Sequence, residues 1–270
     1  MEYNMCLFMR SCVALYEELT GRPLSNRDVH TPFLDDETNW IEQGGKGELA
    51  DIALKILMKV LYGARMCRYD ILRATCMLAR RVSKWDKECD KRLLRLMMYI
   101  RTTADYLTYA YVGDPPENCS IGLFADADFA GCKSTAKSIS GVVVAIVGPS
   151  TFFPLAVVSK KQDCVSTSTT EAEIASMATG LKQEALPTLD LWVSFQGFKV
   201  FENIKFRVKS LLAFEDNQST IVCFKKGVSK QLRHLTRTHR VNLAWCSEVV
   251  TAENCEIPYI DTEKMCRYPY

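Results

Sequence analysis

The chain has 270 residues, of which 48% are hydrophobic and 24% are charged, and this composition is sufficient for one large core or two smaller ones. Its formal net charge of +2 excludes a strongly basic overall field, so any contact with nucleic acid depends on local basic patches. Twelve cysteines without a CxxC pair, together with only three histidines, argue against a structural zinc site and indicate reduced thiols.

Residues 1–48 read as a loop-rich N-terminal segment, polar and interrupted by proline and glycine after residue 21. This segment lacks the basic region and the cleavage site of a signal peptide, and no window of the chain reaches about 18 uninterrupted apolar residues. We therefore expect an intracellular protein, in the cytoplasm or the nucleus, with no membrane partner. From residue 49 to residue 112, apolar residues recur at helical spacing in three amphipathic segments, which predicts a small helical region.

The stretch "YVGDPPENCS", residues 111–120, breaks this pattern and marks a domain boundary. Beyond it, residues 120–131, 138–148 and 150–161 have the alternation and β-branched content of strands, and a Gly-Pro-Ser turn predicts that 139–159 is a hairpin. A Ser/Thr run before an acidic first turn predicts a long helix from residue 166, which Pro187 should end or kink. The stretch 205–216 reads as a fourth strand, followed by a short helix closed by Gly227.

Three strands joined by short turns should be antiparallel, whereas a fourth strand reached through a helix should be parallel to the first. Residues 118–270 are therefore predicted to form a mixed α/β domain. In such a sheet the ends of the first and fourth strands are neighbours, and the helix can present a side chain to the same point.

Three carboxylates occupy these places: Asp126 near the end of the first strand, Glu173 in the first turns of the helix, and Asp216 at the end of the fourth strand. Three acids gathered at one point repel one another unless a divalent cation binds, and carboxylate oxygens suit Mg²⁺ or Mn²⁺. Each motif alone has an ordinary explanation, as an acidic turn, a helix N-terminus or a strand-to-helix turn.

Three stretches carry a resemblance in the same order: "FADADFAGCKSTAKSISGVVVAIVG", "SKKQDCVSTSTTEAEIASMA" and "EDNQSTI". Across about residues 120–245 they resemble the ribonuclease H domain of copia-type retrotransposon polyproteins. The resemblance implies a ribonuclease H-like mixed sheet with flanking helices. It also implies that Asp126, Glu173 and Asp216 hold Mg²⁺ (or Mn²⁺), with no small-molecule cofactor. Asp128 matches the motif as well, either near the metals or as a surface acid.

Residues 50–110 resemble the thumb or connection region that follows the polymerase core of the same reverse transcriptase polyproteins. The Tyr-x-Asp-Asp motif of the polymerase is absent, and Asp35-Asp36 lies in a loop without a flanking apolar strand. We therefore expect no polymerase activity.

The resemblance weakens after residue 236. Asn242 stands where the family has aspartate, and His239 falls at a lysine position, either as a phosphate or proton-transfer residue or as a surface histidine. The family continues past "EKM" to a fourth metal-binding aspartate, whereas this chain ends in "CRYPY". We therefore expect a ribonuclease H-like domain that is incomplete at its C-terminus, truncated or degenerate, in which Asp261 or Glu263 could substitute for the missing acid.

Two functions follow from the resemblance. The first is ribonuclease H activity, the two-metal hydrolysis of RNA in an RNA–DNA hybrid by an endonuclease. The second is an inactive remnant that binds nucleic acid or a polymerase partner, possible because the fourth aspartate is missing. The rest of the polyprotein is a further expected partner. In either case four lysines are the expected backbone contacts: Lys160, Lys161, Lys225 and Lys226.

Overall fold

The computed structural model describes residues 1–33, 45–132, 135–197, 211–251 and 255–265. Its contacts divide the chain into two compact units. Among the described residues, one unit consists of residues 2–109, and the other consists of Met1 and residues 110–265. Within the described ranges, none of the helices combines the length and the apolar character needed to cross a membrane.

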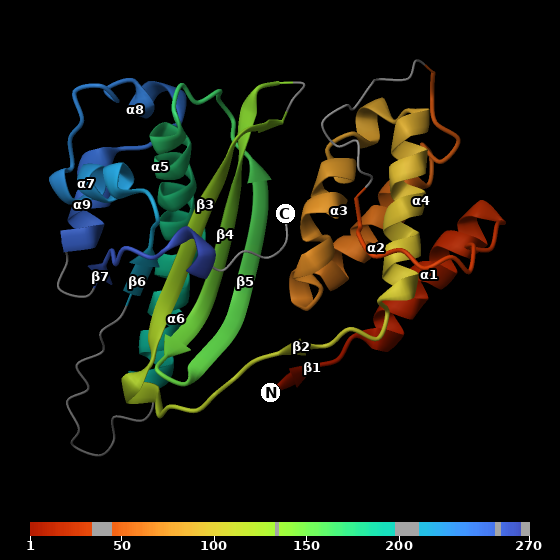
Figure 1. The fold of residues 1–270 in the computed structure, drawn as a ribbon, viewed down its shortest axis with the longest axis horizontal. Coiled ribbons are helices and arrows are strands. Elements are labelled where there is room, and N and C mark those ends of the chain that lie inside the picture. The colour runs from red at the N-terminus through yellow and green to blue at the C-terminus, as the bar shows by residue number, and fades with distance from the viewer. Residues whose placement is uncertain (34–44, 133–134, 198–210, 252–254, 266–270) are drawn as a thin grey trace. The chain divides into compact units, whose positions relative to one another are not determined.

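The first unit is helical (Figure 1). Its helices are α1 (Cys6–Thr20), α2 (Ala53–Met66), α3 (Leu72–Ala79) and α4 (Lys87–Thr102), with 3₁₀ turns at Tyr69–Ile71 and Val82–Lys84. Two short strands, β1 (Glu2–Tyr3) and β2 (Thr108–Tyr109), pair antiparallel. The helices predicted after residue 49 are present.

The prediction that residues 1–48 are loop-rich is wrong for residues 6–20, which form α1. Met9, Val13 and Tyr16 recur at helical spacing along α1, and all three are buried. The helix ends at Gly21, whose φ of 65° is the left-handed conformation that glycine adopts without steric cost. The polar residues after Gly21 hide this pattern when the segment is read as a whole. Part of the predicted loop, residues 34–44, lies outside the described residues.

The second unit contains a five-stranded sheet in the order β5-β4-β3-β6-β7. The strands are β3 (Ser120–Cys132), β4 (Lys137–Gly148), β5 (Thr151–Lys161), β6 (Leu211–Phe214) and β7 (Cys255–Glu256). β3, β4 and β5 pair antiparallel, whereas β6 is parallel to β3 and β7 is parallel to β6. The predicted fold class is confirmed: the unit has the mixed sheet and flanking helices expected of a ribonuclease H-like domain. Residues 205–210 of the predicted fourth strand lie outside the described residues.

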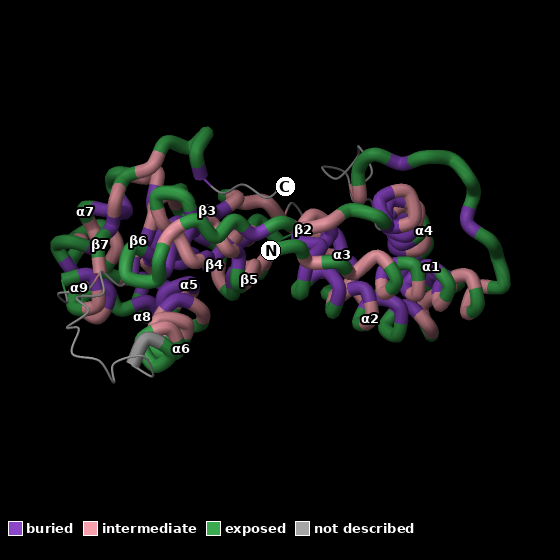
Figure 2. The backbone as a smooth tube through the Cα atoms, turned by 90° about the horizontal axis from the view of Figure 1, so that it is seen from below, coloured by how far each residue is buried: buried purple, intermediate pink, exposed green. Residues whose placement is uncertain are grey.

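Helix α5 (Thr169–Gly180) packs on one face of this sheet, and most of its residues are buried (Figures 1 and 2). The core between helix and sheet includes Leu123, Val142 and Met177. A Cβ at Gly180 would lie 3.0 Å from the Leu123 side chain and 3.1 Å from that of Val142, so glycine permits the close approach. This packing brings the first turns of α5 to the end of the sheet where β3 ends.

The helix continues past Pro187, so the proline does not end it. A π-helical segment (Leu181–Ala185) follows α5, and α6 (Leu186–Gly197) follows directly. Proline lacks a backbone N–H and clashes with the carbonyl four residues earlier in a regular α-helix. The wider π turn lies where that regular ladder would have to accommodate the proline ring.

Among the described residues after β6, three α-helices are present: α7 (Gln218–Lys226), α8 (Leu235–Thr238) and α9 (Leu243–Thr251). The predicted end of α7 at Gly227 is confirmed, since this residue has a φ of 65° and caps the helix. The side chain of Asn242 accepts hydrogen bonds from the backbone amides of Ala244 (3.0 Å) and Trp245 (3.3 Å), the pattern of a helix N-cap. Asparagine and aspartate serve equally well in that role, so Asn242 in place of aspartate preserves the start of α9.

Candidate active site

Asp126 lies at the middle of β3 rather than at its end, two residues after Phe124, the last residue of β3 that pairs with β6, and it is half-buried. Its Oδ1 accepts a hydrogen bond from the amide of Ala127 (2.9 Å). Its backbone carbonyl accepts one from the hydroxyl of Ser176 (2.8 Å), one turn after Glu173 in α5. The strand position of Asp126 is therefore tied directly to the helix that carries Glu173.

Asp128 occupies a different local structure. The pairing of β3 with β4 becomes irregular between Asp128 and Cys132, and Ala130 adopts a φ of 54°. A Cβ added at Gly131 would overlap the carboxylate of Asp128, which therefore lies against this bulge. The two aspartates of the "FADAD" stretch thus have separate surroundings: the backbone of Asp126 contacts α5, and Asp128 lies on the bulge.

Glu173 lies in the second turn of α5, and its residue is only 7% exposed. The helix begins at Ser168, whose hydroxyl accepts a hydrogen bond from the amide of Glu171 (3.2 Å). This is the capping arrangement that the "STSTTEAE" pattern predicts. The Oε2 atom of Glu173 is buried without a hydrogen-bond partner, an unfavourable state for a carboxylate unless a proton or a cation is bound.

Asp216 follows β6 and is half-buried. Its Oδ2 accepts a hydrogen bond from the hydroxyl of Thr262 (2.5 Å), in a 3₁₀ turn spanning Thr262–Lys264. The preceding residues hold this segment in place, since the amide of Ile260 donates to the carbonyl of Glu215 (3.1 Å). Asp261 and Glu263 therefore flank the residue that contacts Asp216, and both are exposed.

The structure brings a further acid, Glu215, to this group of carboxylates, and the sequence analysis did not predict it. It is fully buried, with Oε1 accepting a hydrogen bond from the amide of Asn217 (3.1 Å) and Oε2 without a partner. Leu211 and Ala213 belong to the core beneath α5, and Glu215 continues their alternation to the same face of the strand. That alternation was the available signal, but an acid next to Asp216 in a polar stretch reads as part of the turn.

Electrostatic coupling joins these four carboxylates. Burial, reinforced by the charges of Glu215, Asp126 and Asp216, raises the pKa of Glu173 from 4.5 to about 10. Burial, together with the charges of Asp216 and Asp126, raises the pKa of Glu215 from 4.5 to about 8, against a backbone hydrogen bond from Asn217. The charges of Asp126 and Asp216 therefore reach both Glu173 and Glu215.

The arrangement is not that of an assembled metal centre. Among the residues that the structure describes, no three His, Cys, Asp or Glu side chains are placed so that together they could hold a metal ion. The donor chemistry fits a hard divalent cation, because the oxygens are carboxylates and two of them are buried without partners. Binding such a cation would require the carboxylates to move from the positions they have here.

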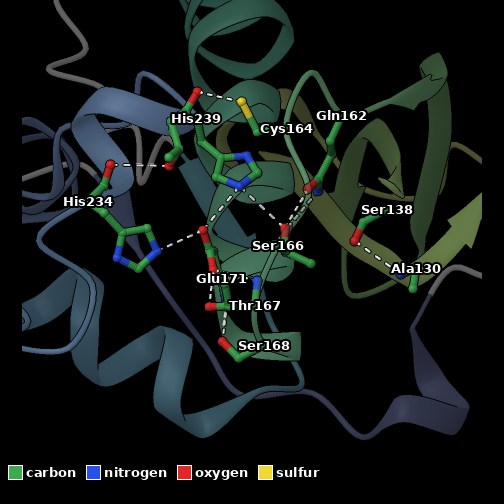
Figure 3. Close-up of polar contacts among 12 residues, drawn as sticks. Ala130, Ser138, Gln162, Cys164, Ser166, Thr167, Ser168, Glu171, His234 and His239 are labelled. Atoms are coloured by element: carbon green, nitrogen blue, oxygen red, sulfur yellow. Dashed lines mark hydrogen bonds and ion pairs between the residues drawn. The ribbon is translucent and has the colours of Figure 1, made fainter. Parts of the chain in front are cut away.

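A second polar cluster surrounds Glu171, the other acid of the first turns of α5 (Figure 3). Its Oε1 lies 3.0 Å from Nε2 of His234 and 3.2 Å from Nε2 of His239. Its Oε2 accepts hydrogen bonds from the amide (2.7 Å) and the hydroxyl (2.6 Å) of Thr167. These hydrogen bonds and the His234 charge lower the pKa of Glu171 despite burial, which acts in the opposite direction.

His239 is therefore not a surface histidine, since its side chain is 3% exposed. Burial lowers its pKa, which favours the neutral ring. The hydroxyl of Ser166 lies 3.4 Å from the same Nε2 atom that contacts Glu171. A relay of the serine-protease type needs opposite ring nitrogens of the histidine for the two partners, so this cluster is not a nucleophilic triad.

The four predicted lysines fall in two places. Lys160 and Lys161 end β5 and, with Ser140, Gln162 and His239, line a small cleft of about 50 Å³. Lys225 and Lys226 lie in the last turn of α7 and are exposed. Through the register with β4, Lys160 and Lys161 lie level with Ala127 and Asp128 of β3, directly after the level of Asp126. Lys225 and Lys226 are not among the residues that line this cleft.

Comparison with known proteins supports the resemblance on sequence grounds. The chain is 27% identical over 224 residues to the retrovirus-related Pol polyprotein from transposon TNT 1-94 of Nicotiana tabacum. The match covers 81% of this chain but 15% of that polyprotein, so the chain spans a small part of its relative. No family model matches. Among solved structures, RNase H1 from the halophilic archaeon Halobacterium salinarum NRC-1 aligns over 53% of this chain and 87% of its own, with 10% identity and a TM-score of 0.32. The predicted relationship to a retrotransposon polyprotein is confirmed.

Proposed function

We propose that this chain is a retrotransposon-derived ribonuclease H-like protein that hydrolyses RNA in RNA–DNA hybrids with the help of Mg²⁺ or Mn²⁺. The observation that carries the proposal is the cluster of Asp126, Glu173, Glu215 and Asp216, in which two buried carboxylate oxygens lack partners. A low-dielectric cluster of acids is unstable as anions unless positive charge is bound. The similarity to a Pol polyprotein supports a nucleic-acid substrate.

In this proposal Asp126, Glu173 and Asp216 hold the cation. Bound Mg²⁺ or Mn²⁺ would activate a water molecule and offset the charge that develops on the phosphate. Asp126 lies in β3 and Asp216 follows β6, each two residues after the last pair of these parallel neighbours, and α5 carries Glu173 beside β3. Asp261 and Glu263, beside Thr262, are the carboxylates available to substitute for the family's fourth acid.

The experiment is a gel assay of hybrid cleavage by the full chain in the presence of Mg²⁺, comparing the unsubstituted protein with Asp126→Asn and Asp128→Asn. The Asp126→Asn protein should cleave at least about a hundredfold more slowly, because one ligand of the cation is lost. Asp128→Asn is the matched control, since it makes the same change two residues away on the bulge. Equal cleavage by all three proteins would remove Asp126 from the mechanism.

A second candidate function is binding without catalysis, to RNA–DNA hybrid or to a polymerase partner. It is favoured by the finding that the described carboxylates do not form an assembled metal-binding group. Anisotropy of a labelled hybrid separates the two candidates. Tight binding together with no cleavage in either Mg²⁺ or Mn²⁺ would support the second and reject the first.

A further inference from the structure

Two histidines clasp the carboxylate of Glu171 at the start of α5 (Figure 3). His234 and His239 each place Nε2 within 3.2 Å of the same oxygen, while Thr167 donates twice to the other oxygen. The side chain of Glu171 is fully buried and that of His239 is 3% exposed, whereas that of His234 is 39% exposed. Both oxygens of this carboxylate therefore have partners, whereas the Oε2 atoms of Glu173 and Glu215 have none.

These contacts join segments that are far apart in the sequence. His234 and His239 flank α8, in the stretch that follows α7, whereas Glu171 and Thr167 belong to the start of α5. A further hydrogen bond runs from the thiol of Cys164 to the carbonyl of Thr238 (2.9 Å). The contacts of Glu171 with the two histidines and of Cys164 with Thr238 thus hold the loop before α5 and the first turn of α5 against the α8 segment.

The same first turn sets the position of Glu173. Side chains two positions apart on an α-helix point about 200° apart, so Glu171 can face the histidines while Glu173 faces the sheet. On the sheet side, Ser176 contacts the carbonyl of Asp126, and the charges of Asp126 and Asp216 act on Glu173. The start of α5 is therefore fixed between the histidines on one side and β3 on the other.

We propose that His234 and His239 are positioning residues: by clasping Glu171 they hold the start of α5 so that Glu173 is directed at Asp126 and Asp216. This inference rests on the proposed ribonuclease H-like function. Hydrogen bonds to a buried charged group are among the stronger ones, so loss of either histidine should loosen the first turn of α5. A catalytic group displaced by about 1 Å can lose about a hundredfold in rate, whereas substrate binding elsewhere is retained.

The test uses the full chain with His234→Ala, His239→Ala and His239→Gln. Glutamine carries an amide nitrogen at nearly the distance of Nε2, so it can restore the hydrogen bond to Glu171 without an imidazole. His30→Ala is the matched control, since His30 is an exposed histidine of the other unit. Amide hydrogen exchange reports the first turn of α5 and, separately, β3, and steady-state kinetics on an RNA–DNA hybrid give kcat and KM.

The expected result is exchange about tenfold faster or more at residues 169–173 in both alanine proteins, with β3 unchanged. Their kcat should fall about ten- to a hundredfold with KM nearly constant, and His239→Gln should recover both exchange and kcat. Unchanged exchange in the first turn, an equal increase over all strands, or unchanged kcat despite faster exchange would overturn the proposal. If the unsubstituted chain does not cleave the hybrid at all, the proposed function fails. The exchange data alone then test whether the two histidines hold the start of α5 through Glu171.

Discussion

Phe124 of β3 and Phe214 of β6 stack face to face, with ring centroids 4.6 Å apart and an interplanar angle of 9°. They are paired in the parallel register of the two strands, and each is followed two residues later by a candidate aspartate, Asp126 or Asp216. Since side chains alternate along a strand, the stack lies on the same face as the two aspartates. The two rings thus fix the separation of β3 and β6 at their last pair, two residues before the aspartates.

Truncating either ring should therefore weaken both the fold and the site. Phe124→Ala and Phe214→Ala should each lower the free energy of unfolding by about 2–4 kcal/mol, measured by urea denaturation. Their double-mutant cycle should show a coupling energy of about 0.5–1.5 kcal/mol, because either single substitution already abolishes the stacking and the second cannot remove it again. Phe129→Ala, at a side chain that is 42% exposed in the same strand, is the control and should change stability by less than about 0.5 kcal/mol. Strict additivity of the two losses would show that the rings do not act as a pair.

The raised pKa values of Glu173 and Glu215 make stability depend on pH. In the unfolded chain both carboxyls lose their protons near pH 4.5, whereas in the folded chain they retain them until about pH 10 and about pH 8. The folded state thus binds more protons in this range, so the free energy of unfolding should fall as pH rises from 4.5 toward 8. Urea denaturation in EDTA at about pH 6 and about pH 9 measures the fall, which Mg²⁺ should reduce at the higher pH. Greater stability at the higher pH would contradict the burial of these acids in protonated form.

Glu215→Gln isolates one contribution to that fall. Glutamine has nearly the same shape and keeps an oxygen that can accept the hydrogen bond from the amide of Asn217, but it carries no charge to repel Asp126 and Asp216. At about pH 8 the substitution should raise the free energy of unfolding by about 1–3 kcal/mol and flatten the pH dependence. Glu256→Gln, at an exposed acid in β7, should leave both unchanged. A loss of stability on Glu215→Gln would mean that the native carboxylate is stabilised as an anion.

The alternation of strand residues and the positions of turns were sufficient to predict the sheet. β4 is rich in β-branched residues and ends at Gly148. Because the turn before β5 is so short, β5 can pair with β4 only in the antiparallel direction. The parallel pairing of β3 with β6 followed from the helix between them, because a crossover is needed to bring the chain back. These are local signals combined with a general rule of connection.

The parts that the sequence did not indicate depend on contacts between distant segments. Glu171 reads as a helix-capping acid, and nothing in its neighbourhood shows that His234 and His239 reach it across more than 60 residues. Glu215 is buried because its strand position points at the core, although its residue type favours solvent. The continuation of the helix beyond Pro187 depends on a π turn, which no residue pattern specifies.

The two lysine pairs should contribute to hybrid binding through phosphate contacts. Lys160 and Lys161 lie at the sheet end near Asp126, whereas Lys225 and Lys226 lie at the far end of α7, about 13 Å along the helix from its start. Replacing both members of a pair by glutamine removes two charges and leaves the backbone unchanged. If each lysine neutralises one phosphate, the slope of log affinity against log salt should become less steep by nearly 2 for each pair.

Anisotropy of a labelled RNA–DNA hybrid over a series of salt concentrations measures that slope, with Lys182→Gln as a control at a single exposed lysine after α5. Rates of cleavage at saturating hybrid should stay within about twofold of the unsubstituted chain, because lysines that only position the substrate act on binding rather than on the chemical step. An unaltered slope for one pair would show that those lysines do not contact phosphates. A lower saturated rate for the Lys160 and Lys161 pair would instead place them close enough to the carboxylate cluster to act on the reacting phosphate.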